Sequence, residues 1–297
     1  MVNEKKSILN NKKIIGYFFV FPSIAVMIIF IIVPLILSFT SSFFDFTIMM
    51  DKFEFVGLDN FRALFADRRF WNSMKNTAYY TAITVPLSNM LSLLVALGVQ
   101  KASRKNVIYR TVYFLPVVCS MTIVALALKM IFDFNIGIVP ELLRQAGLPV
   151  VDLLNSPTLA MPTIIGISIY KSFGFNMVIF IAALQGVPQE LYEAAEIDGA
   201  NKSNKFLKIT LPYIAPTVTF TLITSMISSF QVFDQVYVTT QGGPLFRTET
   251  AVQFIYERAF KTYEMGFANA NAMVLFAIIL VATLITKRLR RNEEGNF

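Results

Sequence analysis

Six long apolar segments constrain the fold of this chain more than any other feature. They cover about residues 14–44, 77–99, 108–132, 160–184, 212–233 and 267–286 of the 297-residue sequence. A helix needs roughly 17–25 apolar residues to cross a bilayer, and each segment is near or above that length. In lipid, only a helix satisfies its own backbone hydrogen bonds over such a run. The sequence therefore predicts an all-α membrane protein with six spans, forming a single domain over 1–297.

The composition excludes several kinds of site. Only 15% of the residues are charged, against roughly 25% in a soluble domain. The sequence has no histidine, and its one cysteine, Cys119, lies inside an apolar segment. It therefore offers no disulfide, no cysteine cluster for a metal, and no histidine base. Paired carboxylates are also missing from the apolar segments. We expect neither an enzyme nor a metal or cofactor site in this chain.

The basic residues predict the orientation. Lys and Arg number 15 in the N-terminus, the 2–3 turn, the 4–5 loop and the C-terminal tail, against nine in the opposite loops. Cytoplasmic loops carry the excess of Lys and Arg, so both termini are expected in the cytoplasm. The first segment is too long for a signal peptide and has no small-residue cleavage site, so we expect a retained helix. Membrane topology explains the distribution of the basic residues, so we expect no nucleic-acid partner.

The loop between the fourth and fifth segments, residues 186–211, has an ordered pattern. Residues 190–198 are rich in helix formers, and Pro188 suits a first helical turn. Gly199 permits a left-handed helix end, and Pro212 opens the next membrane helix. The pattern predicts a helix, a bend and a second helix on the cytoplasmic face. A helix resting on lipid headgroups is the alternative, which Glu193, Glu196 and Asp198 disfavour because anionic lipid repels them.

In this loop Glu193-Ala194-Ala195 is followed after three residues by Gly199, after nine more by Ile209, and after one more by Leu211-Pro212. This string resembles the EAA signature of ABC importer permeases at every spacing. The resemblance implies that this loop docks on a separate ATPase subunit and couples it to the membrane helices. The residues carried over are Glu193, Ala194, Ala195, Asp198, Gly199, Ala200, Leu211 and Pro212.

Four further strings resemble the carbohydrate permeases of the maltose and glycerol-phosphate type. They are FVGLDNF at 55–61, FW with KNT within 70–77, FGFN at 173–176, and TQGGP at 240–244. The resemblance implies a type I ABC importer permease with six helices in the bacterial inner membrane. It also implies a second homologous permease, an ATPase dimer that binds ATP and Mg²⁺, and an extracytoplasmic binding protein that delivers a sugar. The chain has no Gly-x-x-x-x-Gly-Lys-Ser/Thr loop of its own.

Polar residues inside the fourth and fifth segments are candidates for the substrate pathway. Lys171 lies midway along the fourth segment, where a charge costs at least about 2.5–3.5 kcal/mol. Its neighbours at helical spacing share its face, and the fifth segment has a similar stripe. Helix–helix packing, or an ion pair of Lys171 with the second permease, are the alternatives. The candidate residues are Ser168, Lys171, Ser172, Phe175, Thr221, Ser225, Ser228 and Ser229.

Three other functions remain as alternatives. A secondary transporter is disfavoured because no acidic residue falls in the middle of a span. A membrane enzyme lacks a catalytic constellation. An ABC permease for another solute, such as glycerol phosphate or a peptide, would have the same loop at 186–211, and only the flanking strings favour a sugar.

Overall fold

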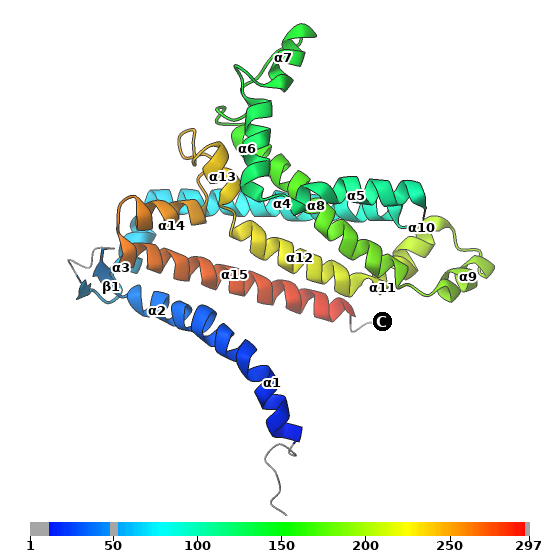
Figure 1. The fold of residues 1–297 in the computed structure, drawn as a ribbon, viewed down its shortest axis with the longest axis horizontal. Helices are drawn as coiled ribbons and strands as arrows, with labels where there is room; N and C mark the ends of the chain where they lie inside the picture. Colours follow the sequence, from blue (N-terminus) through cyan, green and yellow to red (C-terminus); the bar gives the residue numbers. More distant parts are fainter. Residues whose placement is uncertain (1–11, 48–52, 102, 295–297) are drawn as a thin grey trace, which may run out of the picture. The chain divides into compact units, whose positions relative to one another are not determined.

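A computed structural model describes residues 12–47, 53–101 and 103–294. These residues are almost entirely helical (Figure 1), which confirms the all-α prediction. The elements, in chain order, are α1 (Lys12–Met27), the π-helical turn η2 (Ile28–Ile32), α2 (Val33–Ser41), β1 (Phe44–Phe46), β2 (Phe53–Phe55), α3 (Asp59–Ala66), α4 (Arg68–Val99), α5 (Arg104–Val118), α6 (Met121–Phe132), α7 (Ile138–Gln145), α8 (Ala160–Gln185), α9 (Gln189–Ile197), α10 (Lys202–Lys205), the π-helical turn η3 (Phe206–Thr210), α11 (Leu211–Tyr213), α12 (Ala215–Phe230), α13 (Asp234–Thr239), α14 (Ala251–Phe260) and α15 (Met265–Glu294).

Among the described residues, four helical stretches are long and apolar enough to cross a membrane. They are Phe19–Ser41, Arg68–Val99, Ala160–Gln185 and Met265–Leu289. Two further stretches reach that length only as bent pairs, α5 with α6 and Lys202–Tyr213 with Ala215–Thr239. The predicted count of six therefore holds when each bent pair is one span.

The two bends are the main departure from the predicted elements. We predicted continuous helices over 108–132 and 212–233, but α5 and α6 meet at 100° and the second pair at 65°. Cys119 and Ser120 have extended backbones, with ψ of 149° and 143°. These two residues end α5 and separate it from α6. In the second pair, Pro212 opens only the short α11, and Pro216 opens α12 after the break at Ile214. A proline suits a first turn because it has no N–H to pair there.

By their contacts, the described residues form two compact units. The first comprises the chain up to Leu64 together with Arg258–Met273. Within it, the antiparallel hairpin of β1 and β2 pairs Phe44 with Phe55. Position 266, next to this hairpin, accepts only a glycine, because a Cβ on Gly266 would lie 1.9 Å from the carbonyl oxygen of Phe44.

The segment 44–76, between the first two predicted spans, has secondary structure of its own. It contains the short helix α3, and Phe53 and Phe55 before it belong to the strand β2. The next helix, α4, begins at Arg68, well before the predicted start at 77. Asp67 caps it, because its carboxylate accepts a hydrogen bond from the backbone N–H of Arg69 at 2.7 Å.

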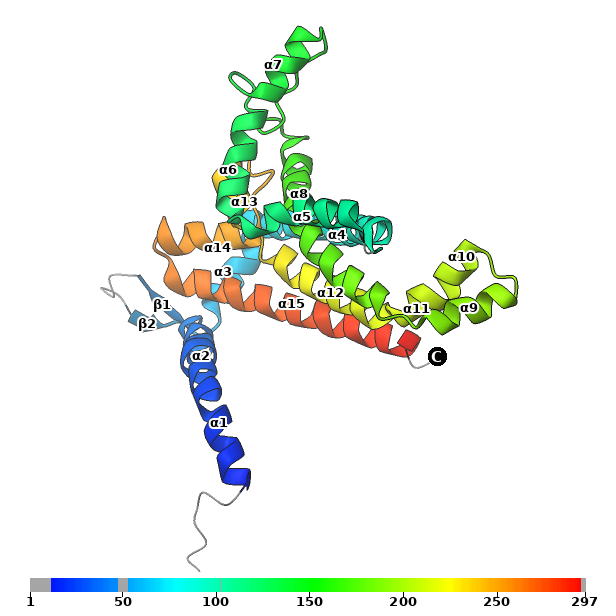
Figure 2. The same ribbon diagram turned by 45° about the vertical axis from the view of Figure 1, so that its right-hand side comes forward.

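The second unit comprises Phe65–Glu257 and the residues from Val274 onward, and its centre is the packing of α4 on α8. Phe180 and Met177 of α8 are buried against Ala96 of α4. Helix α5 also lies close to α8, because a Cβ on Gly174 would be 2.3 Å from the carbonyl oxygen of Tyr113. In Figures 1 and 2, α6 and α7 extend away from α4 and α5, and the first turns of α8 lie beside α6.

Candidate functional site

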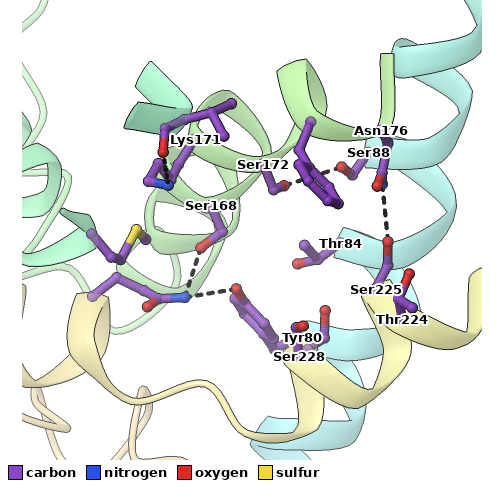
Figure 3. Close-up of a pocket in the computed structure, with 15 residues that line it drawn as sticks. Tyr80, Thr84, Ser88, Ser168, Lys171, Ser172, Asn176, Thr224, Ser225 and Ser228 are labelled. Carbon is purple, nitrogen blue, oxygen red and sulfur yellow. Dashed lines mark hydrogen bonds between the residues drawn. The ribbon is translucent and has the colours of Figure 1, made fainter. Parts of the chain in front are cut away.

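A cavity of about 300 Å³ lies within the second unit, where α4, α8 and α12 meet. The break between α5 and α6 and the first turn of α13 complete its wall. Figure 3 shows polar side chains from three helices directed into it. The lining residues are Tyr80, Thr84, Ser88, Val117, Met121, Ser168, Lys171, Ser172, Phe175, Asn176, Thr224, Ser225, Ser228, Ser229 and Gln235.

Among the fifteen described residues that line this cavity, Lys171 is the single charged one. Its ammonium donates a hydrogen bond to the carbonyl oxygen of Val117 at 3.1 Å (Figure 3). Val117 lies in the last turn of α5, where carbonyls have no partner further along the helix. A cation also interacts favourably with the negative end of a helix dipole. The break in the third span and the lysine in the fourth therefore compensate each other.

A network of hydrogen bonds joins the polar residues across the cavity. The amide of Gln235 donates to the hydroxyls of Tyr80 at 2.9 Å and Ser168 at 3.1 Å. The amide of Asn176 donates to the hydroxyl of Ser225 at 3.0 Å. These bonds connect α13 and α4 to α8, and α8 to α12. The wall is held in shape by polar groups and not by apolar packing alone.

The structure brings seven of the eight predicted pathway residues to this cavity. The exception is Thr221, which is fully buried and donates to the backbone carbonyl of Val218 at 3.0 Å. Thr221 is therefore a packing residue, because its hydroxyl is satisfied within its own helix.

Sequence reasoning missed the contribution of α4. Tyr80, Thr84 and Ser88 recur every four residues, which places them on one face of that helix. This polar stripe in an apolar span was a readable signal. No comparable pattern in the sequence indicated that Gln235 lines the cavity. Its position depends on how α13 packs after α12.

The wall suits a polyhydroxylated solute. It offers hydroxyl groups that both donate and accept, and two amides that do the same. Phe175 is 51% exposed and gives an aromatic surface beside them. None of the fifteen lining residues is acidic.

The segment 186–211 is held in shape by its own contacts. Helix α9 starts after Pro188 and ends before Gly199, whose φ of +75° is left-handed. The N–H of Ala200 returns to the carbonyl of Ala195 at 2.8 Å, which closes the helix end. The hydroxyls of Tyr192 and Thr210 lie 2.7 Å apart. The predicted helix, bend and second helix are confirmed, and Figure 2 shows α9 and α10 meeting at the bend.

Much of this segment faces outward. Glu193, Ala194 and Asp198 are exposed, and Ile197 is 88% exposed. By contrast, four of the residues predicted here for coupling are half-buried against the chain itself. These are Ala195, Ala200, Leu211 and Pro212.

A third feature is the segment 240–250, which packs on the first turns of α4. Arg69 forms ion pairs with Glu249 and Glu257, and its guanidinium lies 4.1 Å from the ring centre of Phe246. The amide of Asn76 donates to the carbonyls of Phe246 and Glu249, both at 2.9 Å. The string within 70–77 thus contacts the residues that directly follow the string at 240–244.

Residues 88–292 match the profile of a family described as binding-protein-dependent transport system inner membrane component. The chain belongs to this family. The permease resembles the probable ABC transporter permease YesP of Bacillus subtilis (strain 168), with 34% identity over 95% of this chain and 92% of YesP. It is 31% identical to the arabinooligosaccharides transport system permease AraP of the same strain, over 98% of this chain and 93% of AraP.

The fold of the permease also matches a solved structure. A chain of a bacterial ABC transporter involved in the import of the acidic polysaccharide alginate superimposes with a TM-score of 0.82. The two chains are 25% identical, and the match covers 94% of this permease and 95% of the other chain. The predicted type I ABC importer permease fold is confirmed. The permease is a membrane transport subunit, and the family assignment argues against the secondary transporter and the membrane enzyme.

Proposed function

We propose that this permease imports a carbohydrate, such as a sugar or an oligosaccharide, through the cavity between α4, α8 and α12. The cavity carries the proposal, because hydroxyls, amides and an exposed aromatic ring line it at the centre of the second unit. Carbohydrate transport by AraP and by the alginate transporter agrees with this chemistry. In this proposal, an extracytoplasmic binding protein delivers the solute, and a second homologous permease forms the other half of the pathway.

The energy comes from a separate ATPase dimer, which binds ATP and Mg²⁺. Helix α9 docks on that dimer through its exposed face, with Glu193 meeting a basic group and Ala194 allowing close approach. The segment 186–211 connects α8 directly to α12, and both helices line the cavity. Movement of the docked helix therefore reaches two walls of the cavity at once and changes the side to which it opens.

In this arrangement α9 faces the cytoplasm of a bacterial cell, and both termini lie on the same side of the inner membrane. The excess of Lys and Arg in the short loops on that side supports this orientation. A reporter that is active only in the cytoplasm, fused after Arg291, should be active. Activity of a periplasm-only reporter at that position would contradict the orientation.

The function is tested by uptake of labelled carbohydrates into cells that contain the complete transporter, compared with cells lacking this permease. We expect uptake of at least one carbohydrate to require both the permease and an active ATPase. Replacing Ser225 by Val, which removes the hydroxyl between Asn89 and Asn176, should reduce uptake without changing the amount of permease in the membrane. Uptake restricted to peptides or other non-carbohydrate solutes would contradict the proposal.

A further inference from the structure

We infer that the carbohydrate carried by this permease bears a negatively charged group, which the ammonium of Lys171 receives. The inference rests on the proposed function and specifies the class of substrate. Carboxylate, phosphate and sulfonate groups share the chemistry required, which is an anionic oxygen that accepts a charge-assisted hydrogen bond.

The charge of the cavity wall carries the inference. Lys171 is charged, and the other fourteen lining residues are neutral. Its hydrogen-bond partner among the described residues is the carbonyl of Val117, which is itself neutral. An ammonium has three donors, so one bond to a carbonyl leaves capacity for a ligand. A solute with an anionic group would supply the negative charge that Lys171 does not find in this wall.

A neutral carbohydrate gives no reason for a lysine at this place. The hydroxyls and amides of the wall already provide donors and acceptors. A glutamine at 171 would have an N–H for the Val117 carbonyl without placing a charge inside a span, where charges are costly. The presence of a full positive charge at this position therefore points to a ligand and not only to the end of α5.

The arrangement along α8 gives the substrate an orientation. Lys171 and Phe175 are one helical turn apart and both line the cavity. An anionic group bound at Lys171 places the attached sugar ring next to the half-exposed ring of Phe175. Asn176 follows on the same wall, and its amide already bonds to Ser225. Charge recognition, ring contact and hydroxyl recognition thus fall in sequence on one helix.

Lys129 provides a matched control within the same unit. Its ammonium also donates to a backbone carbonyl, that of Val238, at the same 3.1 Å distance. It lies in an apolar helix as Lys171 does, but it does not line the cavity. If embedded lysines serve only to satisfy carbonyls at broken spans, the two residues should behave alike when each is replaced by glutamine.

The experiment measures uptake by the complete transporter in cells, with three sets of labelled probes. These are neutral disaccharides, the same disaccharides with one hexose oxidised to its hexuronate, and their 6-phosphate and 6-sulfonate forms. We expect the wild-type transporter to carry at least one anionic set in preference to its neutral counterpart. The set that is transported identifies which anionic group is the natural one.

Lys171→Gln should raise the KM for the anionic probe about tenfold or more, because it removes a charge-assisted hydrogen bond. Lys171→Arg should retain most of the uptake, and Lys129→Gln should leave the preference between anionic and neutral probes unchanged. A structural defect would instead lower the maximal rate for every probe equally.

The inference is overturned if the transporter carries only neutral carbohydrates, or if Lys171→Gln lowers uptake of neutral and anionic probes to the same extent. Either result leaves the proposed carbohydrate function standing. Failure to carry any probe, neutral or anionic, while a non-carbohydrate solute enters the cells, overturns the proposed function itself.

Discussion

Two segments of this permease, 186–211 and 240–250, each contain a left-handed glycine, but the two glycines have different surroundings. Each has a glycine in the left-handed region, Gly199 at φ +75° and Gly242 at φ +87°. A side chain on Gly199 would meet nothing within 4 Å, whereas one on Gly242 would lie 3.3 Å from the Cβ of Glu249. Gly199 faces open space, and Gly242 faces the chain itself.

The residues around the two glycines also differ in how deeply they are buried. Within 240–250, Thr248, Glu249 and Thr250 are at most 1% exposed. The backbone also has positive φ at Gln241, Leu245 and Phe246, a conformation that costs energy in residues with a side chain. Leu245 and Phe246 are themselves 80% and 51% exposed. In 186–211, the internal bonds shape the helices, but most residues of α9 remain exposed, with Tyr192 and Ala195 half-buried. We infer that residues 248–250 are enclosed by this chain and that the exposed face of α9 is covered by a partner.

Four predictions test this comparison, ordered by their expected effect on the stability of the folded permease. The largest effect should come from Arg69→Met. It leaves Glu249, whose side chain is 1% exposed, without its arginine. Breaking a buried ion pair in this way typically costs about 3–5 kcal/mol. Thermal unfolding of the purified transporter should occur at a clearly lower temperature. Arg62→Met is the control, because the Arg62–Asp59 pair is exposed and worth little.

The two glycines provide the second prediction. Replacing either by alanine should cost about 1–2 kcal/mol from the left-handed backbone alone. Gly242→Ala should cost more, since its new methyl group presses on Glu249 in a buried setting. Gly199→Asn should be milder than Gly199→Ala, because asparagine tolerates this conformation. Equal loss of folded permease for the two alanine variants would remove the distinction between the segments.

Tyr192→Phe is expected to have a smaller effect. It removes the hydrogen bond between Tyr192 and Thr210, which joins α9 to η3. The net contribution of such a bond is about 0.5–1.5 kcal/mol. The permease should remain folded, but α9 should become less firmly held. Hydrogen exchange of the α9 amides should increase, while exchange in α4 and α8 should stay at the wild-type level. Unchanged exchange in α9 would show that this bond does not hold the helix.

Glu193→Arg should have the smallest effect on stability and a large one on transport. Glu193 is exposed, and exposed substitutions usually change stability by less than about 0.5 kcal/mol. Its charge reversal should nevertheless abolish co-purification of the ATPase and carbohydrate uptake. Glu141→Arg on α7 is the control and should leave ATPase association intact. Normal association and normal uptake in Glu193→Arg would make 186–211 an ordinary connection.

The sequence by itself determined the features of this permease that depend on neighbouring residues. The length of the apolar segments predicted the membrane helices, because lipid leaves the backbone no other way to satisfy its polar groups. The helix, bend and helix of 186–211 were readable because Pro188 and Gly199 act on their own backbone. The polar faces of α8 and α12 followed from helical spacing alone, as the polar face of α4 would have done.

Tertiary structure alone decided what depends on distant residues. The break at Cys119 and Ser120 lies inside an apolar run and is compensated by Lys171, which is 54 positions away from Val117. Arg69 meets Glu249 across 180 positions. Thr221 has the same spacing pattern as its neighbours, yet it packs instead of lining the cavity. Such pairings depend on how whole helices are placed against one another, and helical periodicity records which face a residue occupies but not what that face will meet.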